Sequence, residues 1–292
     1  MQIVHASALP IEHKQSGGRV GSYRRRVVMR GKEGDPGNFS LILYYQDGSF
    51  ESPRHRHSFD QFRYQIDGDS DFSRNGKMSA GVLAYFPEGA HYGPQFGPPH
   101  TVAVLQFGGP SGSGYLSNRQ TKVAREELNR IGSFEGGIFR RHPGIAGKKA
   151  QDGYEAVWEH VYQRKLVYPE PQYSLPIMMD TNHWPWTPFE SSQGIVEQAL
   201  GVFTHCRIRA ARYKFDAGAE FIATGRGIYM VLSGAGILAD QTYQELSTLY
   251  LDDGETATFK AGEETIILLM GLPSIALMKS QQQSQRRTQA AE

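Results

Sequence analysis

Short apolar runs separated by turn-forming residues are the feature that most constrains the fold. The runs are rich in Val, Ile, Leu, Tyr and Phe, and 33 glycines and 15 prolines are spread along the 292 residues. Runs of this kind, each bounded by turn signals, are typical of antiparallel sheets. They are found at 39–45, 57–66, 82–86, 101–107, 207–215, 227–232 and 265–270. We therefore expect an all-β chain with two β-rich blocks.

The stretch between the two blocks has a different pattern. Apolar residues recur at near-helical spacing in 121–131 and again in 154–162, which predicts two helices. The end of the chain has few apolar residues, so we expect it to be disordered. The expected organisation is an N-terminal block at 1–116, a helical connector at 117–165, a C-terminal block at 166–279 and a tail at 280–292.

Charge and hydropathy exclude several classes of partner. The chain has 31 Lys and Arg against 30 Asp and Glu, so no strong overall field attracts nucleic acid or an anionic membrane. The longest apolar stretch, 266–278, is interrupted by Gly271 and Pro273, and a membrane-spanning helix needs about 20 apolar residues. The single cysteine, Cys206, cannot form an intrachain disulfide, which fits a reducing compartment. We expect a cytoplasmic protein that binds neither nucleic acid nor membrane.

His55 and His57 are separated by one residue in a segment that we expect to be extended. Alternate side chains of a strand point to the same face, so both imidazoles should lie on one side. One divalent ion can bind both rings, since metal bonds to imidazole nitrogen are about 2.0–2.1 Å long. The same alternation places Gln61 and Arg63 on that face, whereas Tyr64 should point the other way.

The spacing around this pair resembles that of the cupin superfamily over residues 48–95. The positions shared with its two motifs are Gly48, His55, His57, Gly68, Gly81, Pro87 and Gly89. A fainter likeness between the blocks matches Gly234 to Gly68 and Gly254 to Gly81, which suggests an internal duplication. Together these resemblances imply an all-β fold of two tandem cupin (jelly-roll) barrels joined by a short helical segment.

Three positions depart from the cupin pattern. The family glutamate is Gln61 here, which removes a negative charge and a candidate proton acceptor. The family histidine of the second motif falls at Tyr92, whereas this sequence has its histidine one residue earlier, at His91. A shift of one residue reverses the direction of a side chain on a strand. We favour His91 as the third metal ligand, because the turn at 89–90 can absorb the shift, and Tyr92 is the alternative. The family asparagine is replaced by Gln95.

The C-terminal block lacks ligands at the matching positions. With Gly234 aligned to Gly68, the ligand positions of the first motif hold Phe221, Ala223 and Gly227, and that of the second motif holds Thr265. These side chains do not form a divalent-metal site. We therefore expect a metal-binding cupin at 1–116 and a degenerate, metal-free cupin at 166–279.

The ligand set implies a type of substrate. Three neutral imidazoles leave a divalent ion with a net charge near +2, which favours an anionic chelating substrate and leaves positions for O2. This set, beside a metal-free second barrel, is similar to that of gentisate and salicylate ring-cleaving dioxygenases and of diketone-cleaving enzymes. The resemblance implies a non-heme Fe(II)-dependent dioxygenase that cleaves a C–C bond of a small aromatic or enolic substrate, with O2 as the second reactant.

That resemblance assigns roles to individual residues. The implied metal ligands are His55, His57 and His91, with Gln61 as a fourth ligand or a hydrogen-bonding group. The candidate catalytic residues are Gln61, Arg63, Tyr85 and Tyr92. Arg63 would bind a substrate carboxylate through its planar fork, or it would pair with Asp60 or Asp67.

Two alternatives stay open. A redox-neutral isomerase, lyase or decarboxylase would use Zn, Ni or Mn in place of Fe(II), because such a ligand set does not select the metal. The second alternative is a bicupin that binds a small molecule without turnover, because this fold supports several functions. In each case the partner is a small molecule. The resemblance also implies a homodimer or higher homo-oligomer, since open sheet edges need covering.

Overall fold

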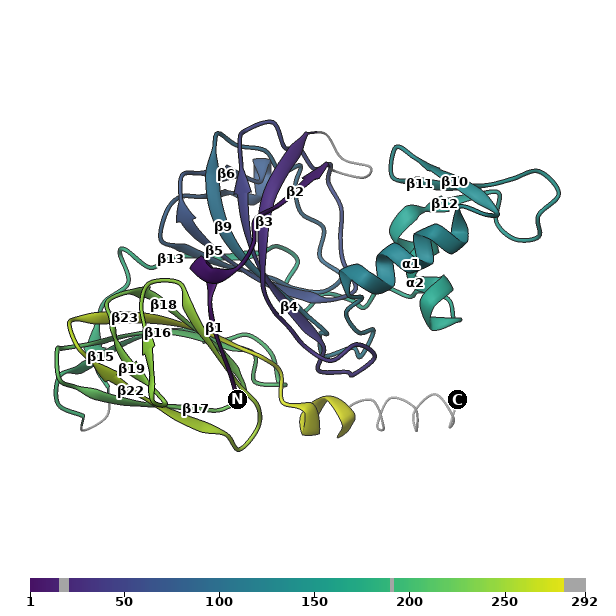
Figure 1. Ribbon diagram of the computed structural model, residues 1–292. Coiled ribbons are helices and arrows are strands. Elements are labelled where there is room, and N and C mark those ends of the chain that lie inside the picture. The colour runs from purple at the N-terminus through teal and green to yellow at the C-terminus, as the bar shows by residue number, and fades with distance from the viewer. Residues whose placement is uncertain (16–20, 190–191, 281–292) are drawn as a thin grey trace.

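The computed structural model describes residues 1–15, 21–189 and 192–280 (Figure 1). Two seven-stranded sheets dominate it, one in each half of the molecule. The prediction of an all-β fold with two tandem jelly-roll barrels joined by a short helical segment is confirmed. The expected disordered tail lies, from residue 281 onward, outside the described residues. No helix in the described part of the chain is long and apolar enough to cross a membrane.

The first large sheet is antiparallel and forms the N-terminal barrel with two short strands, β6 (Ser70–Asp71) and β7 (Lys77–Met78). Two short 3-10 helices are also present, η1 (Ala6–Ala8) and η2 (Ser73–Asn75). The order of strands across the sheet is β13 (Ile177–Asp180), β8 (Val82–Phe86), β5 (Asp60–Asp67), β9 (His100–Phe107), β4 (Phe39–Gln46), β3 (Ser22–Arg30) and β2 (Glu12–Gln15).

The second large sheet repeats this order in the C-terminal barrel. It runs β1 (Gln2–His5), β21 (Ser247–Leu251), β18 (Gly227–Ser233), β23 (Thr265–Gly271), β16 (Arg209–Phe215), β15 (Ile195–Val202) and β14 (Thr187–Pro188). A four-stranded sheet completes this barrel, in the order β17 (Glu220–Thr224), β22 (Thr256–Ala261), β19 (Gly236–Leu238) and β20 (Gln241–Tyr243).

Each large sheet ends in a strand from the other half of the chain. The N-terminal strand β1 lies beside the strands of the C-terminal half in Figure 1, and it pairs with β21, with Ile3 opposite Leu249. In return, β13 pairs with β8, with Met179 opposite Leu83. The boundaries expected from the sequence, at residues 116 and 166, did not include this exchange of edge strands. Because each barrel supplies an edge strand to the other, the two barrels are tied together by backbone hydrogen bonds.

The two faces of β5 have different surroundings. One lies in the apolar layer between the two large sheets, which we call the seam, and the other faces the polar interior of the first barrel. Phe62 and Tyr64 belong to the main apolar core, which also contains Met230 and Leu268 of the second sheet. The two large sheets therefore pack against each other. Alternate residues of β5, including Arg63, are buried on the opposite face, inside the first barrel. Burying one apolar face fixes the register of this strand, since a slip of one residue would exchange the two faces.

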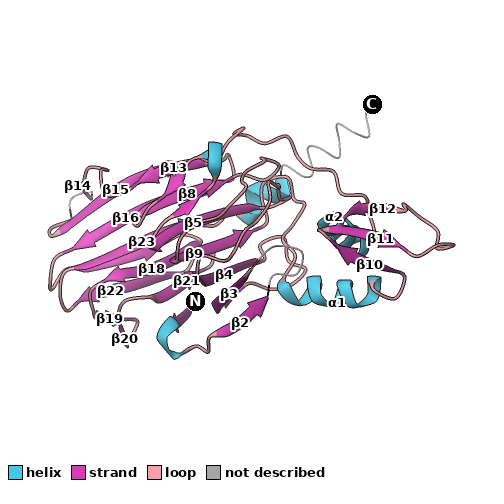
Figure 2. Cartoon of the chain, turned by 90° about the horizontal axis from the view of Figure 1, so that it is seen from above, coloured by secondary structure: helices cyan, strands magenta, loops and turns pink. Residues whose placement is uncertain are grey.

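The connector between the barrels is a small folded unit, which we call the cap (residues 117–165). It contains α1 (Asn118–Leu128), α2 (Gly153–Tyr162) and a sheet of β10 (Gly132–Glu135), β11 (Ile138–Arg141) and β12 (Ala150–Asp152). Both helices were predicted, but the sheet was not. Ser117 and Gln120 form a capping box at the start of α1, and Trp158 and Phe139 lie in the cap's own apolar core. Figure 2 shows the cap at one end of the molecule.

Candidate functional site

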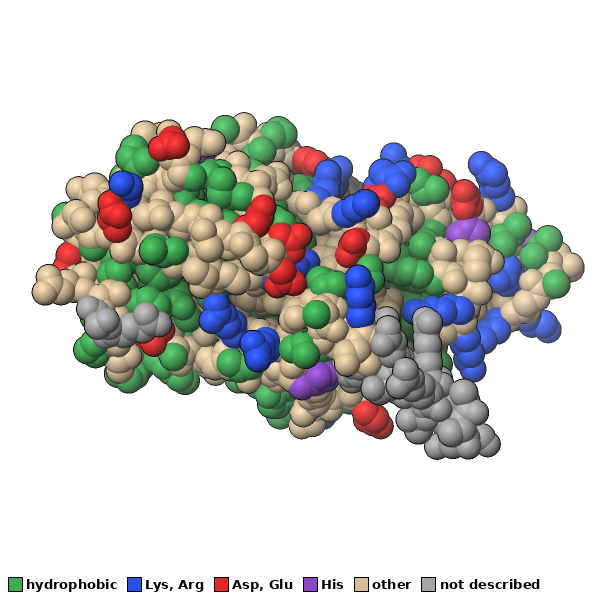
Figure 3. All heavy atoms as spheres, turned by 90° about the horizontal axis from the view of Figure 1, so that it is seen from below, with side chains coloured by type: hydrophobic (Ala, Val, Ile, Leu, Met, Phe, Trp, Pro, Cys, Tyr) green, Lys and Arg blue, Asp and Glu red, His purple; other side chains and the backbone are tan. Residues whose placement is uncertain are grey.

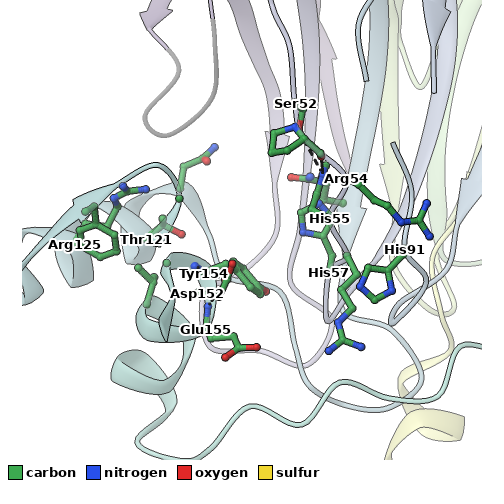
Figure 4. Close-up of a pocket in the computed structure, with 18 of the residues that line it drawn as sticks. Ser52, Arg54, His55, His57, His91, Thr121, Arg125, Asp152, Tyr154 and Glu155 are labelled. Carbon is green, nitrogen blue, oxygen red and sulfur yellow. Dashed lines mark hydrogen bonds between the residues drawn. The ribbon is translucent and has the colours of Figure 1, made fainter. Parts of the chain in front are cut away.

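Two adjoining cavities lie at the mouth of the first barrel. A cleft of about 570 Å³ separates the barrel from the cap (Figure 4). A smaller cavity of about 70 Å³ lies inside the barrel, and Arg63 and Gln95 are among its lining residues. Four residues line both cavities, namely Tyr23, Tyr44, His57 and Gln106. The inner cavity and the cleft therefore meet at these side chains.

His57 lies at this junction and His55 lines the cleft, both just before β5 begins at Asp60. Their rings are 4.8 Å apart between centroids and nearly perpendicular. The Nδ1 atom of His55 is 2.6 Å from the carbonyl oxygen of Pro53. A carbonyl oxygen can only accept, so Nδ1 carries the proton and Nε2 is the nitrogen that can accept a bond. The ring of His57 stacks on Phe59, with 4.4 Å between centroids.

The structure places Tyr92, not His91, inside the barrel. Backbone hydrogen bonds of 3.0 and 2.9 Å join residues 55 and 92 in both directions, and this pairing directs the side chain of Tyr92 inward, where it is 1% exposed. His91 consequently points outward and is exposed at the rim of the cleft. Burial, with the charges of Arg56 and Arg54, lowers the pKa of His91. The turn at Gly89 therefore does not absorb the one-residue shift, and the structure does not bring His91, the expected third ligand, inside the barrel with Tyr92.

A polar network joins the inward residues of the first barrel. Gln61 donates from Nε2 to the Tyr92 hydroxyl at 2.9 Å. The Arg63 guanidinium donates to that hydroxyl at 3.1 Å and to Gln61 Oε1 at 3.2 Å. It also donates to Gln95 Oε1 at 2.7 Å. These three acceptors are electrically neutral. The guanidinium further lies 4.7 Å from the ring centroid of Phe86, so aromatic contact helps to hold the buried cation.

Comparisons with known proteins identify the architecture. No protein-family model matches the sequence, and no curated protein matches it. A candidate dioxygenase from Nostoc punctiforme has a TM-score of 0.61 at 11% identity, covering 94% of this chain and 83% of that one. Oxalate decarboxylase from Bacillus subtilis has a TM-score of 0.55 at 13% identity, covering 93% and 76%. A candidate glyoxylate-induced protein from Pseudomonas aeruginosa has a TM-score of 0.55 at 11% identity, covering 89% and 84%. The chain has the bicupin fold. At these identities the likeness extends to the fold alone.

The inward residues of this bicupin do not fit the expected three-histidine metal centre. Among the described residues, no three or more His, Cys, Asp or Glu side chains form a group that could hold a metal ion. Beside the two imidazoles stand the Tyr92 hydroxyl and the Gln61 amide oxygen, and both accept hydrogen bonds from Arg63. A permanent guanidinium cation that is hydrogen-bonded to these two oxygens repels a divalent ion that would bind to them.

The second barrel of the bicupin aligns differently from the sequence expectation. By strand order, β21 takes the place of β8. Gly89 follows β8 and Gly254 follows β21, and their φ angles are 80° and 81°. Gly254 therefore corresponds to Gly89, and its expected match with Gly81 was wrong. The position of Gly81 is taken in the second barrel by Leu246, which has a φ of 61°. Because this left-handed residue is not a glycine, the sequence pattern did not reveal the correct match.

The interior of the second barrel is apolar at the corresponding positions. In this alignment Ala257 replaces Tyr92, and Tyr229 replaces Arg63. Both lie in a buried cluster with Phe221 and Ala223, which were expected at the ligand positions. Aromatic and methyl groups fill the space that holds the polar network in the first barrel. The candidate site therefore belongs to the first barrel and the cap.

Tyr85 does not belong to the site. Its ring stacks on Phe203 of the second half at 4.7 Å, and it lines neither cavity. Burial raises the pKa of Tyr85, as does the nearby carboxylate of Asp60. Asp60 shares the seam face of β5 and accepts a bond from the backbone of Glu88 at 2.7 Å. Tyr85, expected as a candidate catalytic residue, thus lies in the apolar core between the two large sheets, and Asp60 faces away from Arg63.

The cap supplies site residues that the sequence did not reveal. The Tyr154 hydroxyl lies 2.9 Å from the Ser58 hydroxyl, and its ring lies 6.0 Å from that of His57. Tyr168, just after the cap, lies under the Arg56 guanidinium at 3.8 Å. Arg125 lines the far wall of the cleft (Figure 4). No motif spacing links these residues to His55 or His57, because tertiary packing alone brings the cap to the barrel mouth.

Proposed function

We propose that the first barrel binds a small organic acid, with Arg63 receiving its carboxylate. One observation carries this proposal: Arg63 is a buried cation, only 8% exposed as a residue, and it lines the inner cavity. A guanidinium presents parallel N–H groups that match a carboxylate. In a poorly solvated cavity the attraction between the two charges is stronger than in water.

The sizes of the cavities support a ligand with a small charged head. The inner cavity has a volume of about 70 Å³, and one water occupies about 30 Å³, so the cavity has room for a carboxylate group and little more. The cleft of about 570 Å³ falls in the range of small-molecule sites, about 300–1,000 Å³. The head of the acid would occupy the barrel and its body the cleft.

The side chains at the junction support an acid with a flat or apolar body. Tyr23 and Tyr44 meet edge to face at 5.3 Å, and both line the two cavities. His57 and Gln106 line them as well and offer hydrogen-bonding groups to the polar end of the ligand. This arrangement favours binding and orientation of the acid without a metal ion.

Calorimetric titration tests the proposal with matched ligand pairs. Benzoate and hexanoate are compared with benzamide and hexanamide, which have the same shape without the charge. We expect the acids to bind and the amides to bind weakly or not at all. Arg63→Gln should weaken acid binding by about 10- to 100-fold, the loss expected for a charge-assisted hydrogen-bonded pair. Arg63→Lys keeps the charge without the planar fork, so its affinity for the acids should lie between that of the wild type and that of Arg63→Gln. Unchanged affinity in Arg63→Gln, with the fold intact by circular dichroism, would refute the proposal.

An Fe(II)-dependent dioxygenase that cleaves a C–C bond is the second candidate function. The adjacent rings of His55 and His57 favour it, as does the fold likeness to the candidate dioxygenase of Nostoc punctiforme. A redox-neutral decarboxylase draws similar support from oxalate decarboxylase, whose Mn(II) centres have been characterised. Elemental analysis and oxygen uptake with catechol, gentisate and diketones decide between them. Stoichiometric iron with uptake would favour the dioxygenase, and stoichiometric manganese without uptake the decarboxylase. Neither metal and no uptake would leave the organic-acid site.

A further inference from the structure

Arg125 is the charged residue of α1 that has no carboxylate partner among the described residues. The other charged side chains of this helix have partners: Arg119 pairs with Glu33, Lys122 pairs with Glu126, and Glu127 is hydrogen-bonded to His160. Arg125 instead lies over the ring of Phe134 at 4.3 Å and lines the cleft. It is half-buried, and burial lowers its pKa. A half-buried cation of this kind is stabilised when an anion binds beside it.

The surroundings of the cleft favour an anion over a cation. The cap has ten Lys and Arg residues against six Asp and Glu, whereas the whole chain has a net charge of only +1. Lys and Arg side chains gather over this end of the molecule in Figure 3. Arg54 and Arg56 line the opposite wall of the cleft. Such a local excess of positive charge attracts anionic ligands and speeds their association.

The two carboxylates that line the cleft serve the start of α2. Asp152 accepts the backbone N–H groups of residues 154 and 155 at 2.8 and 3.0 Å. Glu155 lies in the first turn of the same helix, where the helix dipole favours a negative charge. Their charges are thus partly balanced within α2. Arg25, the fourth arginine of the cleft, is paired with Glu12 at 2.9 Å.

We propose that the ligand is an elongated organic dianion, with one carboxylate at Arg63 and a second anionic group at Arg125. This inference rests on the proposed function, since it takes the first anchor from there. The inner cavity has room only for the head of the ligand, so the rest must lie in the cleft. Figure 4 shows Arg125 across the cleft from His55 and His57. Phe134, Tyr154 and Tyr168 line the space as well, so an apolar or aromatic segment between the two charges fits it.

A chain-length series tests the two-anchor arrangement. The dicarboxylates from succinate to sebacate are titrated against the linear monocarboxylates with the same number of carbons. We expect the dicarboxylate to bind about tenfold more tightly than its monocarboxylate partner once the chain is long enough to reach the cap, as one further charge-assisted contact allows. Arg125→Gln should remove this advantage, and Arg125→Lys should retain part of it. Added salt should reduce the advantage in the wild type.

Arg130→Gln is the matched control. It makes the same substitution just after α1, at an exposed residue that lines neither cavity, and it should leave the advantage intact. Equal affinities for both ligand types at every length, or an advantage that survives Arg125→Gln, would overturn the inference. The proposed function would still stand if monocarboxylates bound in an Arg63-dependent manner. If no carboxylate bound, or if Arg63→Gln left the affinity for carboxylates unchanged, the proposed function itself would fail.

Discussion

Removing the Tyr92 hydroxyl should destabilise the protein, because this oxygen accepts two buried hydrogen bonds. Gln61 donates to it at 2.9 Å and Arg63 at 3.1 Å. In Tyr92→Phe the ring remains and the volume hardly changes. Both donors then lose an acceptor in a place with little access to water, since Tyr92 is 1% exposed. An unsatisfied buried donor loses its desolvation energy without compensation.

The magnitude follows from the two bonds. A bond between neutral groups contributes about 1 kcal/mol, and a bond from a charged group contributes about 1.5–3 kcal/mol. Arg63 keeps Gln61 and Gln95 as acceptors, so the loss from its bond should fall at the low end. We expect the free energy of unfolding to fall by about 2–3 kcal/mol in Tyr92→Phe. His91→Ala removes an exposed ring instead and should change it by less than about 0.5 kcal/mol.

Equilibrium unfolding in urea, followed by circular dichroism, measures both variants under the same conditions. The order of the two effects is the informative result, because it reports which residue points into the barrel. A large loss in His91→Ala with little change in Tyr92→Phe would refute the register between residues 55 and 92. It would also restore His91 as a candidate ligand.

Three further predictions concern pH, metal ions and the exchanged strands. Burial raises the pKa of Glu88 to about 7, and burial and Glu88 together raise that of Asp60. The folded state thus holds protons that the unfolded state releases. Between about pH 5 and about pH 8, the free energy of unfolding should therefore fall as the pH rises. Glu88→Gln should flatten this dependence in urea unfolding, and a rise in stability toward pH 8 would contradict it. Dialysis against EDTA should change neither the melting temperature nor the affinity for benzoate, and a clear loss of either would support a metal centre. Val4→Pro should expose β21 by breaking its pairing with β1, seen as faster amide exchange at Thr248 and Tyr250. Unchanged exchange there would contradict the pairing.

Local periodicity in the sequence was enough to predict an all-β chain with two β-rich blocks and the inward side chains of β5, and the resemblance to the cupin motifs added the two tandem barrels. The alternation of Phe62 with Gln61 and Arg63 along β5 shows which residues face the barrel interior, because successive side chains of a strand point to opposite faces. The glycine after each of two strands, Gly68 and Gly234, indicated the duplication. Both features depend on residues that are close in the sequence.

Features set by contacts between distant residues could not be predicted in this way. The orientation of Tyr92 depends on its backbone bonds to His55, and the composition of the turn at Gly89 does not reveal them. The exchange of β1 and β13 depends on which open edge each strand reaches. Arg125 reaches the cleft because the cap folds back onto the barrel mouth. In each case the deciding interaction joins segments whose local patterns fit either arrangement.

A crystal structure of the protein with bound benzoate tests the central claim most directly, when it is combined with anomalous scattering to detect metal ions. We expect the carboxylate oxygens to lie about 2.7–3.0 Å from the Arg63 guanidinium, with no metal ion between the rings of His55 and His57. A metal ion bound by those rings, with the carboxylate coordinated to it and Arg63 turned away, would contradict the account.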